Sequence, residues 1–307
     1  EYDLRCALAD YVRERRNVVT APEHIVVGAG VQMLLEILCV LLKGRRTVSF
    51  PDGSFVQGST VFAAHGYTVR TRYKDADIIY VSPSHMNRQG DVMPIQRRLE
   101  LCAHSADTGA VVIEDDFEND FLYSSTPTPS LYALGSGNVV YMGAFSALLL
   151  PGIRISFMVL SPALAAAYHQ MKDTFAQTAS KTEQIALCAY LRDGNMKSRT
   201  KKIRRLYTGK AKTLCALLAK ALPDHPVRVG ENGLQVQIET PMLPDSAPFE
   251  QAGLALYIVK EKSGKNIVVV SPSAVPADRL EEAALAVAAA LYKAEEAAKA
   301  KQSKDIY

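Results

Sequence analysis

The amino-acid sequence predicts an α/β fold with a mainly parallel sheet covered by helices, followed by a smaller α+β domain. Through the first half of the 307 residues, short apolar strands alternate with helical stretches. These strands are apolar on both faces, which is typical of parallel strands buried on both sides. Near residue 180 a long helical region replaces the alternation, and further short strands follow it. We therefore expect a large domain over residues 1–180, and a connecting helix with a small C-terminal domain over residues 181–307.

Seven short apolar runs in the first domain have the length and composition of buried strands. They are Ile25–Val27, Thr47–Phe50, Tyr67–Arg70, Ile78–Val81, Ala110–Ile113, Val139–Met142 and Ile155–Val159. Helices are expected over Asp3–Val12, Val31–Leu42, Ile95–Ala106 and Pro162–Phe175. The second domain should begin with helical residues Glu183–Ala221 and end with the alanine-rich helix Leu280–Ala298. The strands expected between them are Val227–Val229, Leu234–Ile238, Leu254–Val259 and Ile267–Val270.

The composition is that of an ordinary globular protein. Hydrophobic residues make up 48% of the chain, which is enough for a large core. No apolar run reaches the length of a membrane span, and no charged-then-apolar leader follows Glu1, so we expect no membrane partner. The five scattered cysteines lack metal-ligand spacing and suit reduced thiols in a cytoplasm. A net charge of +3 is too small to indicate a nucleic-acid partner for this chain.

Residues 139–157 are the most informative stretch of the sequence. A short strand should end at Gly143, and a Pro-Gly pair forces a turn between Ser146 and Arg154, eight positions later. The stretch closely resembles the active-site segment of fold-type-I pyridoxal-phosphate enzymes, in the version found in MocR-type (GabR-like) regulators. In that family the residue after Ser146 is the lysine that forms a Schiff base with the cofactor. Here it is Ala147, whose methyl group cannot form an imine.

The resemblance covers nearly the whole chain and depends on the order and spacing of several short strings. They include Ala21-Pro22-Glu23-His24, Gly28-Ala29-Gly30-Val31-Gln32, Pro51-Asp52-Gly53-Ser54-Phe55, Tyr80-Val81-Ser82-Pro83-Ser84-His85, Glu114-Asp115-Asp116 and Thr182-Glu183-Gln184. Each string alone is a weak signal. Together they imply the fold of the fold-type-I pyridoxal-phosphate-dependent transferases. They also imply a homodimer, because in such proteins the pocket lies between subunits.

Three matched regions imply contacts to pyridoxal phosphate. Gly30, Val31 and Gln32 open a helix, where backbone N–H groups favour a phosphate; the alternative is a tight packing turn. Asp115 matches the carboxylate that contacts the pyridine nitrogen; the alternative is a solvated acidic strand end or a helix cap. Arg154 matches the arginine that binds the cofactor phosphate; the alternative is a structural ion pair with the acidic cluster.

Other family positions are only partly kept. Ser146 is retained, and His85 falls beside the expected cofactor ring, where the alternative is a structural histidine. Phe55 and Phe117 occupy cofactor-contact positions where the family has tyrosines, and Val31 occupies the position of a small hydroxyl residue. Ala144 and Leu148 stand where the family has threonines. Gln57 and Ala274 stand where it has arginines that bind a substrate carboxylate.

Two further patterns have ordinary explanations. Ser180-Lys181-Thr182 repeats the missing Ser-Lys-Thr triplet, but it falls in the family's inter-domain segment, so chance explains it better than a relocated catalytic lysine. The basic run at residues 197–205 is typical of a solvated helix face and does not predict nucleic-acid binding.

Two functions remain open. The first is an effector-binding and oligomerisation domain of a MocR-type transcriptional regulator, without transaminase activity and with pyridoxal phosphate bound non-covalently if at all. The rival is a pyridoxal-phosphate-dependent aminotransferase whose catalytic lysine was replaced by alanine. The several independent departures, and a block missing between Tyr73 and Asp75 relative to the family, favour natural loss over deliberate replacement.

The expected partners follow from the resemblance. We expect a homodimer that takes a small-molecule effector. MocR-type regulators contact DNA through an N-terminal winged-helix domain, which is absent from this chain. We therefore expect DNA binding only through such a domain, and either this chain is a fragment of a longer protein or the protein has lost it.

Overall fold

The computed structural model describes residues 1–307 apart from 88–90, 117–128, 136, 150–151, 261–263 and 305–307. The chain divides into two compact units. The first comprises Glu1–Met86, Val92–Asp120 and Thr126–Lys201, and the main segment of the second is Lys202–Tyr307. This division lies one helix later than the predicted boundary at residue 180, because the helix Lys181–Arg192 packs against the N-terminal helix.

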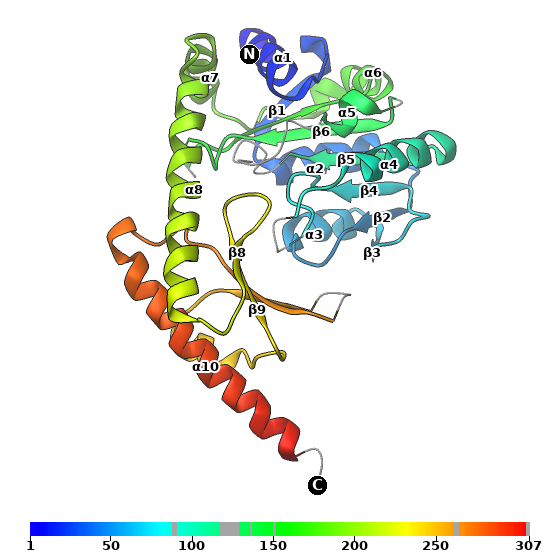
Figure 1. Ribbon diagram of the computed structural model, residues 1–307. Coiled ribbons are helices and arrows are strands. Elements are labelled where there is room, and N and C mark those ends of the chain that lie inside the picture. Colours follow the sequence, from blue (N-terminus) through cyan, green and yellow to red (C-terminus); the bar gives the residue numbers. More distant parts are fainter. Residues whose placement is uncertain (88–90, 117–128, 136, 150–151, 261–263, 305–307) are drawn as a thin grey trace. The chain divides into compact units, whose positions relative to one another are not determined.

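The first unit is built on a seven-stranded sheet (Figure 1). In the order β1-β7-β6-β5-β4-β2-β3, the strands from β6 to β3 are parallel, and β7 is antiparallel to β1 and β6. The mainly parallel sheet expected from the sequence is therefore confirmed. The strands are β1 (Ile25–Ala29), β2 (Thr47–Phe50), β3 (Thr68–Thr71), β4 (Ile78–Val81), β5 (Val111–Asp115), β6 (Val139–Ala144) and β7 (Ile155–Val159).

Helices cover both faces of this sheet (Figure 1). One face is covered by α2 (Val31–Leu41), α3 (Val56–Ala64) and α6 (Pro162–Met171), whose apolar side chains join the main core. The other face carries α4 (Ile95–Thr108), α5 (Leu131–Leu134) and α1 (Tyr2–Arg16), and α7 (Lys181–Arg192) packs against α1. Among the described residues, no helix is long and apolar enough to cross a membrane.

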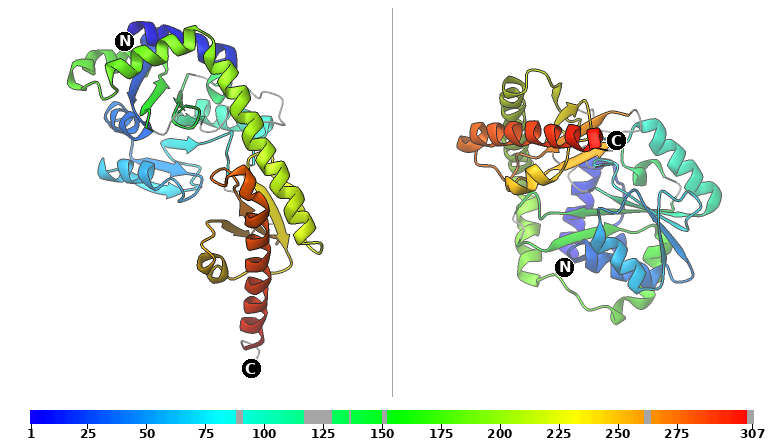
Figure 2. Two further views of the ribbon diagram at one scale, coloured as in Figure 1. Left: turned by 90° about the vertical axis from the view of Figure 1, so that its left-hand side faces the viewer. Right: turned by 90° about the horizontal axis from the view of Figure 1, so that it is seen from below.

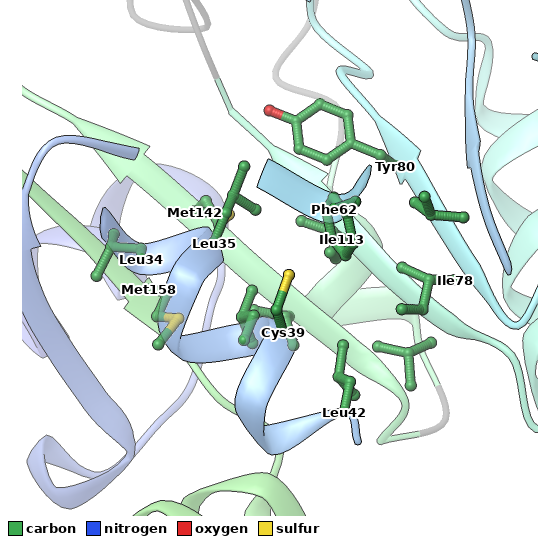
Figure 3. Packing of buried hydrophobic residues seen from close by; sticks show 14 of the residues in the cluster. Leu34, Leu35, Cys39, Leu42, Phe62, Ile78, Tyr80, Ile113, Met142 and Met158 are labelled. Atoms are coloured by element: carbon green, nitrogen blue, oxygen red, sulfur yellow. The ribbon is translucent and has the colours of Figure 1, made fainter. Parts of the chain in front are cut away.

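The main core lies between α2 and the sheet. Figure 3 shows Leu34 and Leu35 of α2 beside Met142 and Met158 of the neighbouring strands β6 and β7. The apolar positions of α2 recur every three or four residues, so one face of the helix is buried along its length. Tyr80 stands at the rim of the cluster, and its hydroxyl points away from the labelled apolar side chains. That hydroxyl can therefore form a hydrogen bond at the carboxyl end of the neighbouring strand β5.

The second unit contains a four-stranded antiparallel sheet in the order β10-β11-β9-β8. The long helices α8 (Asn195–Ala221) and α10 (Leu280–Lys304) run along this sheet (Figure 2), and the short α9 (Ala247–Gln251) packs against α10. Apolar side chains of the three helices, β9 and β11 form its core. The strands are β8 (Val227–Val229), β9 (Val236–Thr240), β10 (Tyr257–Lys260) and β11 (Asn266–Val270).

The prediction that β6 ends at Gly143 is wrong. The strand continues to Ala144, and Gly143 pairs with Phe157 of β7. A Cβ at position 143 would lie 2.6 Å from Cζ of Phe157. Glycine is therefore required inside the strand so that the aromatic ring can pack over the backbone, and it does not break the strand.

Three helical predictions also need correction. The sequence analysis assigned no helix after Phe55, where α3 begins. The single helical region expected over Glu183–Ala221 breaks between α7 and α8 at Gly194, which has a left-handed φ of 71°. The helix expected over Pro162–Phe175 ends as α6 at Met171 and continues as one 3₁₀ turn.

A buried ion network joins α1 to β5. Arg16 Nε lies 2.7 Å from Asp116 Oδ2, and Arg16 Nη2 lies 3.7 Å from Glu114 Oε1. These three side chains are at most 5% exposed. The Tyr141 hydroxyl donates a hydrogen bond of 2.6 Å to Asp116. Because side chains alternate along a strand, Asp115 between the two paired acids faces the opposite side of the sheet.

The pKa values of Glu114 and Arg16 are shifted by the neighbouring groups of this network. Burial and the neighbouring charge of Asp116 raise the pKa of the Glu114 carboxyl to about 7. Burial alone would lower the pKa of Arg16, but the charges of Asp116, Tyr141 and Glu114 outweigh it and hold that pKa above its ordinary value. A single guanidinium therefore compensates two buried acids.

A second polar contact joins the N-terminal ends of β2 and β4. Asp77, directly before β4, accepts hydrogen bonds through Oδ2 from the backbone N–H groups of Arg46 (2.8 Å) and Thr47 (2.9 Å) and from the Thr47 hydroxyl (3.0 Å). The bond from Arg46, the bonds from Thr47 and the charge of Arg45 outweigh the effect of burial and lower the pKa of Asp77. This carboxylate holds the starts of β2 and β4 in register.

Replacing Asp77 should destabilise the protein in a pH-dependent way. We expect Asp77→Ala to lower the free energy of unfolding at pH 7 by about 2 kcal/mol, because a charged hydrogen-bond acceptor is removed. The folded-state pKa of Asp77 is depressed, so its contribution is present above the unfolded pKa of about 4 and is lost as the pH falls below it. Urea unfolding at several pH values measures both effects. The exposed neighbour Asp75→Ala is the control, and a deficit that is independent of pH contradicts the assignment.

Replacing Arg16 should lower the free energy of unfolding more than replacing Asp77 does. Arg16→Met leaves two buried carboxyl groups without a counter-charge, so we expect a loss of about 3–5 kcal/mol at pH 7. The loss of stability should become smaller between pH 7 and pH 5, because protonation of Glu114 removes one of the two buried negative charges. Arg13→Met on the same helix removes only an exposed pair with Asp10 and should change stability by less than about 1 kcal/mol. Equal effects of the two substitutions in chemical denaturation contradict the role of the network.

Candidate functional site

Gly30 and Arg154, both proposed from the sequence as phosphate contacts, lie together at the start of α2. Gly30 precedes the helix with a positive φ of 93°. A Cβ at this position would lie 2.6 Å from Nη2 of Arg154, so the guanidinium rests directly against the glycine. Only glycine satisfies both the backbone conformation and the close approach. The acidic cluster pairs with Arg16, whereas Arg154 contacts Gly30.

The first turn of α2 offers further groups to an anion. No side chain caps the helix, so its first backbone N–H groups keep their hydrogen-bonding capacity. Val31 is half-buried and Gln32 is exposed in this turn. Uncapped N–H groups, the positive end of the helix dipole and an adjacent guanidinium together form a suitable cradle for a phosphate.

Thr178 also contributes to this cradle, and the sequence analysis missed it. Its Oγ1 accepts a hydrogen bond of 2.9 Å from the backbone N–H of Ala29, the last residue of β1. Since the oxygen accepts this bond, the hydroxyl proton remains available for another acceptor. Thr178 is distant in sequence from Ala29, and no local pattern signals the contact.

Asp115 faces the α2 side of the sheet at the end of β5. Its carboxylate accepts a hydrogen bond from the hydroxyl of Tyr80 on the neighbouring strand β4. Burial and the charge of Asp115 raise the pKa of Tyr80 well above its ordinary value, so the tyrosine remains a neutral donor. Glu114 and Asp116 are buried, so the alternative of a solvated acidic strand end does not hold for this segment.

Phe55 joins this group through Tyr80. The two ring centroids are 5.3 Å apart with the planes tilted by 33°. The ring of Phe55 also covers Gly58, where a Cβ would clash with it. Phe55, Tyr80 and Asp115 therefore form an aromatic and acidic group at the carboxyl ends of β2, β4 and β5, where open α/β sheets bind ligands.

The segment after β6 carries Ala147, the position that the sequence analysis matched to the family's lysine. Ser146 is half-buried, Ala147 is exposed and Leu148 is buried, and these residues form a turn. Arg199 of α8 donates a hydrogen bond of 3.3 Å to the carbonyl oxygen of Leu148. This bond was missed because Arg199 was assigned to the solvated face of the basic run. Position 147 presents only a methyl group to its surroundings.

The remaining site predictions have different outcomes. His85 is half-buried in the turn after β4, and its backbone N–H donates to the carbonyl of Ser82 at 3.0 Å. Phe117 lies outside the described residues. Gln57 is exposed in α3, and Ala274 is exposed in the second unit. Neither position supplies a cation for a substrate carboxylate.

Lys181 belongs to the Ser-Lys-Thr triplet that the sequence analysis attributed to chance. It is the first residue of α7, and its ammonium group lies 3.3 Å from the carboxylate of Glu1. Its side chain is 77% exposed. Ser180 caps the same helix by accepting a hydrogen bond from the backbone N–H of Glu183. Ser180-Lys181-Thr182 therefore forms the start of α7.

The residues present fit one end of pyridoxal phosphate and not the other. Gly30, Arg154 and the start of α2 fit a phosphate, and Asp115 offers a carboxylate to a pyridine nitrogen. Ala147 offers no amine for a carbonyl group. Within the described ranges no cluster of three or more metal-ligating side chains occurs.

Comparison with known proteins is consistent with this geometry. The family model of aminotransferase class I and II matches residues 1–278. The chain is 30% identical over 287 residues to the uncharacterised HTH-type transcriptional regulator YdeL of Bacillus subtilis, covering 89% of this chain and 60% of the relative. It is 34% identical over 251 residues to YhdI, another uncharacterised HTH-type regulator of that organism, covering 77% and 54%. The chain thus spans less than two thirds of the length of these relatives.

A solved structure shows the same fold. The structure of LysN, an alpha-aminoadipate aminotransferase from Thermus thermophilus complexed with N-(5'-phosphopyridoxyl)-L-leucine, has a TM-score of 0.77 and 23% identity. The match covers 96% of this chain and 82% of that one. The expected fold-type-I transferase fold is confirmed, as is the expected likeness to regulators with aminotransferase-like domains. The chain belongs to the aminotransferase class I and II family.

Proposed function

We propose that this chain is the effector-binding and oligomerisation domain of a MocR-type transcriptional regulator, and that it binds a phosphorylated small molecule without transaminase activity. The proposal is supported by the phosphate cradle at Gly30 and Arg154, together with the methyl group at position 147, which offers no amine. The HTH-type regulators among its relatives support the regulatory context.

Pyridoxal phosphate is the first ligand to consider. When attached to a lysine, it supplies an electron sink for amino-acid chemistry. In this chain Gly30, Arg154 and the α2 N–H groups would hold its phosphate, and Asp115 would face its ring nitrogen. With alanine at position 147, we expect this binding to be non-covalent and weak.

The partners follow from the same proposal. DNA contact belongs to a winged-helix domain outside this chain, and the signal from the effector would reach it through the assembled regulator. The five free cysteines fit a reducing cytoplasm.

Loss of Arg154 tests the phosphate cradle. We expect pyridoxal phosphate to raise the melting temperature of the parent protein, and Arg154→Ala to remove most of that shift, because the guanidinium makes a charge-assisted contact with the phosphate. Pyridoxal without phosphate should give a small shift that is equal in both proteins. Arg72→Ala, which changes an exposed arginine directly after β3, is the matched control. No shift of the parent at millimolar ligand contradicts the proposal.

The rival function is an aminotransferase whose lysine was replaced by alanine, and the fold shared with LysN favours considering it. Ala147→Lys separates the two. If the pocket has diverged, this variant should show no turnover of amino acids, because the residues around position 147 no longer match a catalytic site. Turnover of any amino acid with pyridoxal phosphate by Ala147→Lys, measured as keto-acid release, would support the rival.

We also propose a homodimer. Large apolar side chains stay exposed on the helices, including Met33 on α2, Ile185 on α7 and Leu206 on α8. A second copy would remove such surface from water. Light scattering at micromolar concentration should give about twice the chain mass of 33.5 kDa. A mass equal to one chain contradicts this assembly.

A further inference from the structure

A cavity of about 470 Å³ lies at the edge of the first unit's sheet where the parallel strands begin. Its size is in the usual range of small-molecule sites. Figure 3 shows Leu42, which lines the cavity, and Tyr80 of the candidate site at opposite ends of the apolar cluster. The residues that line the cavity along this edge lie beside the starts of β4, β5 and β6 and the end of the antiparallel β7, and they are Asp77, Val111, Asn138 and Ser161. The cavity is therefore separate from the phosphate cradle.

Part of the lining is apolar. Leu41 and Leu42 come from the C-terminal end of α2. Ala163 and Leu164 come from the first turn of α6. Leu42 is buried, and Leu41 and Leu164 are half-buried. A ligand with an apolar body would remove more of this surface from water, which is favourable.

The start of α6 supplies hydrogen-bond donors to the same cavity. Ser161 is 4% exposed, and its side chain makes no capping hydrogen bond with the helix. Pro162, the first residue of α6, has no N–H group, so the first donors are the backbone N–H groups of Ala163 and Leu164. They stand at the positive end of the dipole of a ten-residue helix. Lys43 adds an exposed ammonium group to the lining, so these groups together favour an anion.

The negative groups of the lining are already engaged by the chain itself. At the end of α2, the Val40 carbonyl accepts a hydrogen bond of 3.3 Å from the N–H of Lys43. The Leu42 carbonyl accepts one of 3.0 Å from the N–H of Arg45. Oδ2 of Asp77 accepts three hydrogen bonds from residues at the start of β2. One negative charge on a ligand is therefore tolerated, whereas the carboxylate of Asp77 disfavours a second one.

We propose that this cavity is a second ligand site of the chain and that it binds an organic monocarboxylate. The carboxylate accepts hydrogen bonds from the Ser161 hydroxyl and from the two N–H groups of α6, and Lys43 supplies the opposite charge. The apolar body of the ligand lies against the leucines of α2 and α6. This inference goes beyond the proposed function and does not depend on it, because the cavity and the phosphate cradle share no residue.

The test uses octanoate as the probe, with 1-octanol and octylammonium as matched neutral and cationic probes. Dissociation constants are measured by ligand-observed NMR, and we expect octanoate to bind most tightly. Lys43→Gln should weaken octanoate about threefold, as for an exposed charge pair, and should leave 1-octanol unchanged. Ala163→Trp places a large ring at the cavity and should remove the binding of octanoate.

Matched controls change exposed residues outside the lining. Lys172→Gln and Ala166→Trp should both bind octanoate as the parent does. Melting temperatures without ligand check folding, and Ala163→Phe repeats the comparison if Ala163→Trp does not fold.

The outcomes separate this inference from the proposed function. If the parent binds 1-octanol or octylammonium as tightly as octanoate, the site does not recognise an anion and the inference is wrong. Unchanged octanoate binding by Ala163→Trp also overturns it, because the probe then lies elsewhere. Competition by inorganic phosphate, or loss of octanoate binding in Arg154→Ala, would assign the probe to the cradle, so the inference fails and the proposed function stands. Octanoate binding by a parent that does not bind pyridoxal phosphate contradicts only the proposed function.

Discussion

The ion network of Arg16 with Glu114 and Asp116 is the constraint on which the first unit depends. It buries two carboxyl groups at the end of β5 against one guanidinium from α1. Ser130, directly before α5, donates to the Arg16 carbonyl, and the Tyr132 N–H of α5 donates to Glu114. Two helices and the central strand are thereby tied together on one face of the sheet.

The same network determines what the opposite face presents. Since side chains alternate along β5, pairing of the flanking acids with Arg16 leaves Asp115 on the α2 side, where Tyr80 donates to it. The carboxylate is therefore held by its neighbours and does not need a bound ligand to fix its position. A structural interaction on one face thus holds a carboxylate in position on the other face.

The phosphate cradle is fixed by backbone geometry and packing, whereas position 147 contributes only one side chain. The cradle is made of backbone geometry, at Gly30, and of one cation that packs on it, Arg154. These features are part of how α2 begins and how β7 meets β1. Position 147, in contrast, is a single exposed residue in a turn, and it carries the methyl group of Ala147. Under the proposed function, this fold keeps an anion site without covalent attachment of the ligand.

Sequence patterns predicted the sheet well because buried parallel strands are short, continuous apolar runs, and Thr47–Phe50, Ile78–Val81 and Ile155–Val159 match the structure residue for residue. The helix α3 was missed because its apolar and polar residues show no clear helical periodicity. Tyr80 and Thr178 could not be assigned to the site, because strand pairing and a segment distant in sequence bring them there. Gly143 was misread because only its partner Phe157 shows why glycine is needed.

The most direct measurement of the central claim is covalent trapping. The protein is saturated with pyridoxal phosphate, as monitored by ligand fluorescence, then reduced with borohydride, and its intact mass is determined. The account predicts saturable binding at a site competed by inorganic phosphate, with no specific gain in mass. A stoichiometric phosphopyridoxyl adduct on one lysine, located by peptide mapping and lost on competition with phosphate, would contradict it.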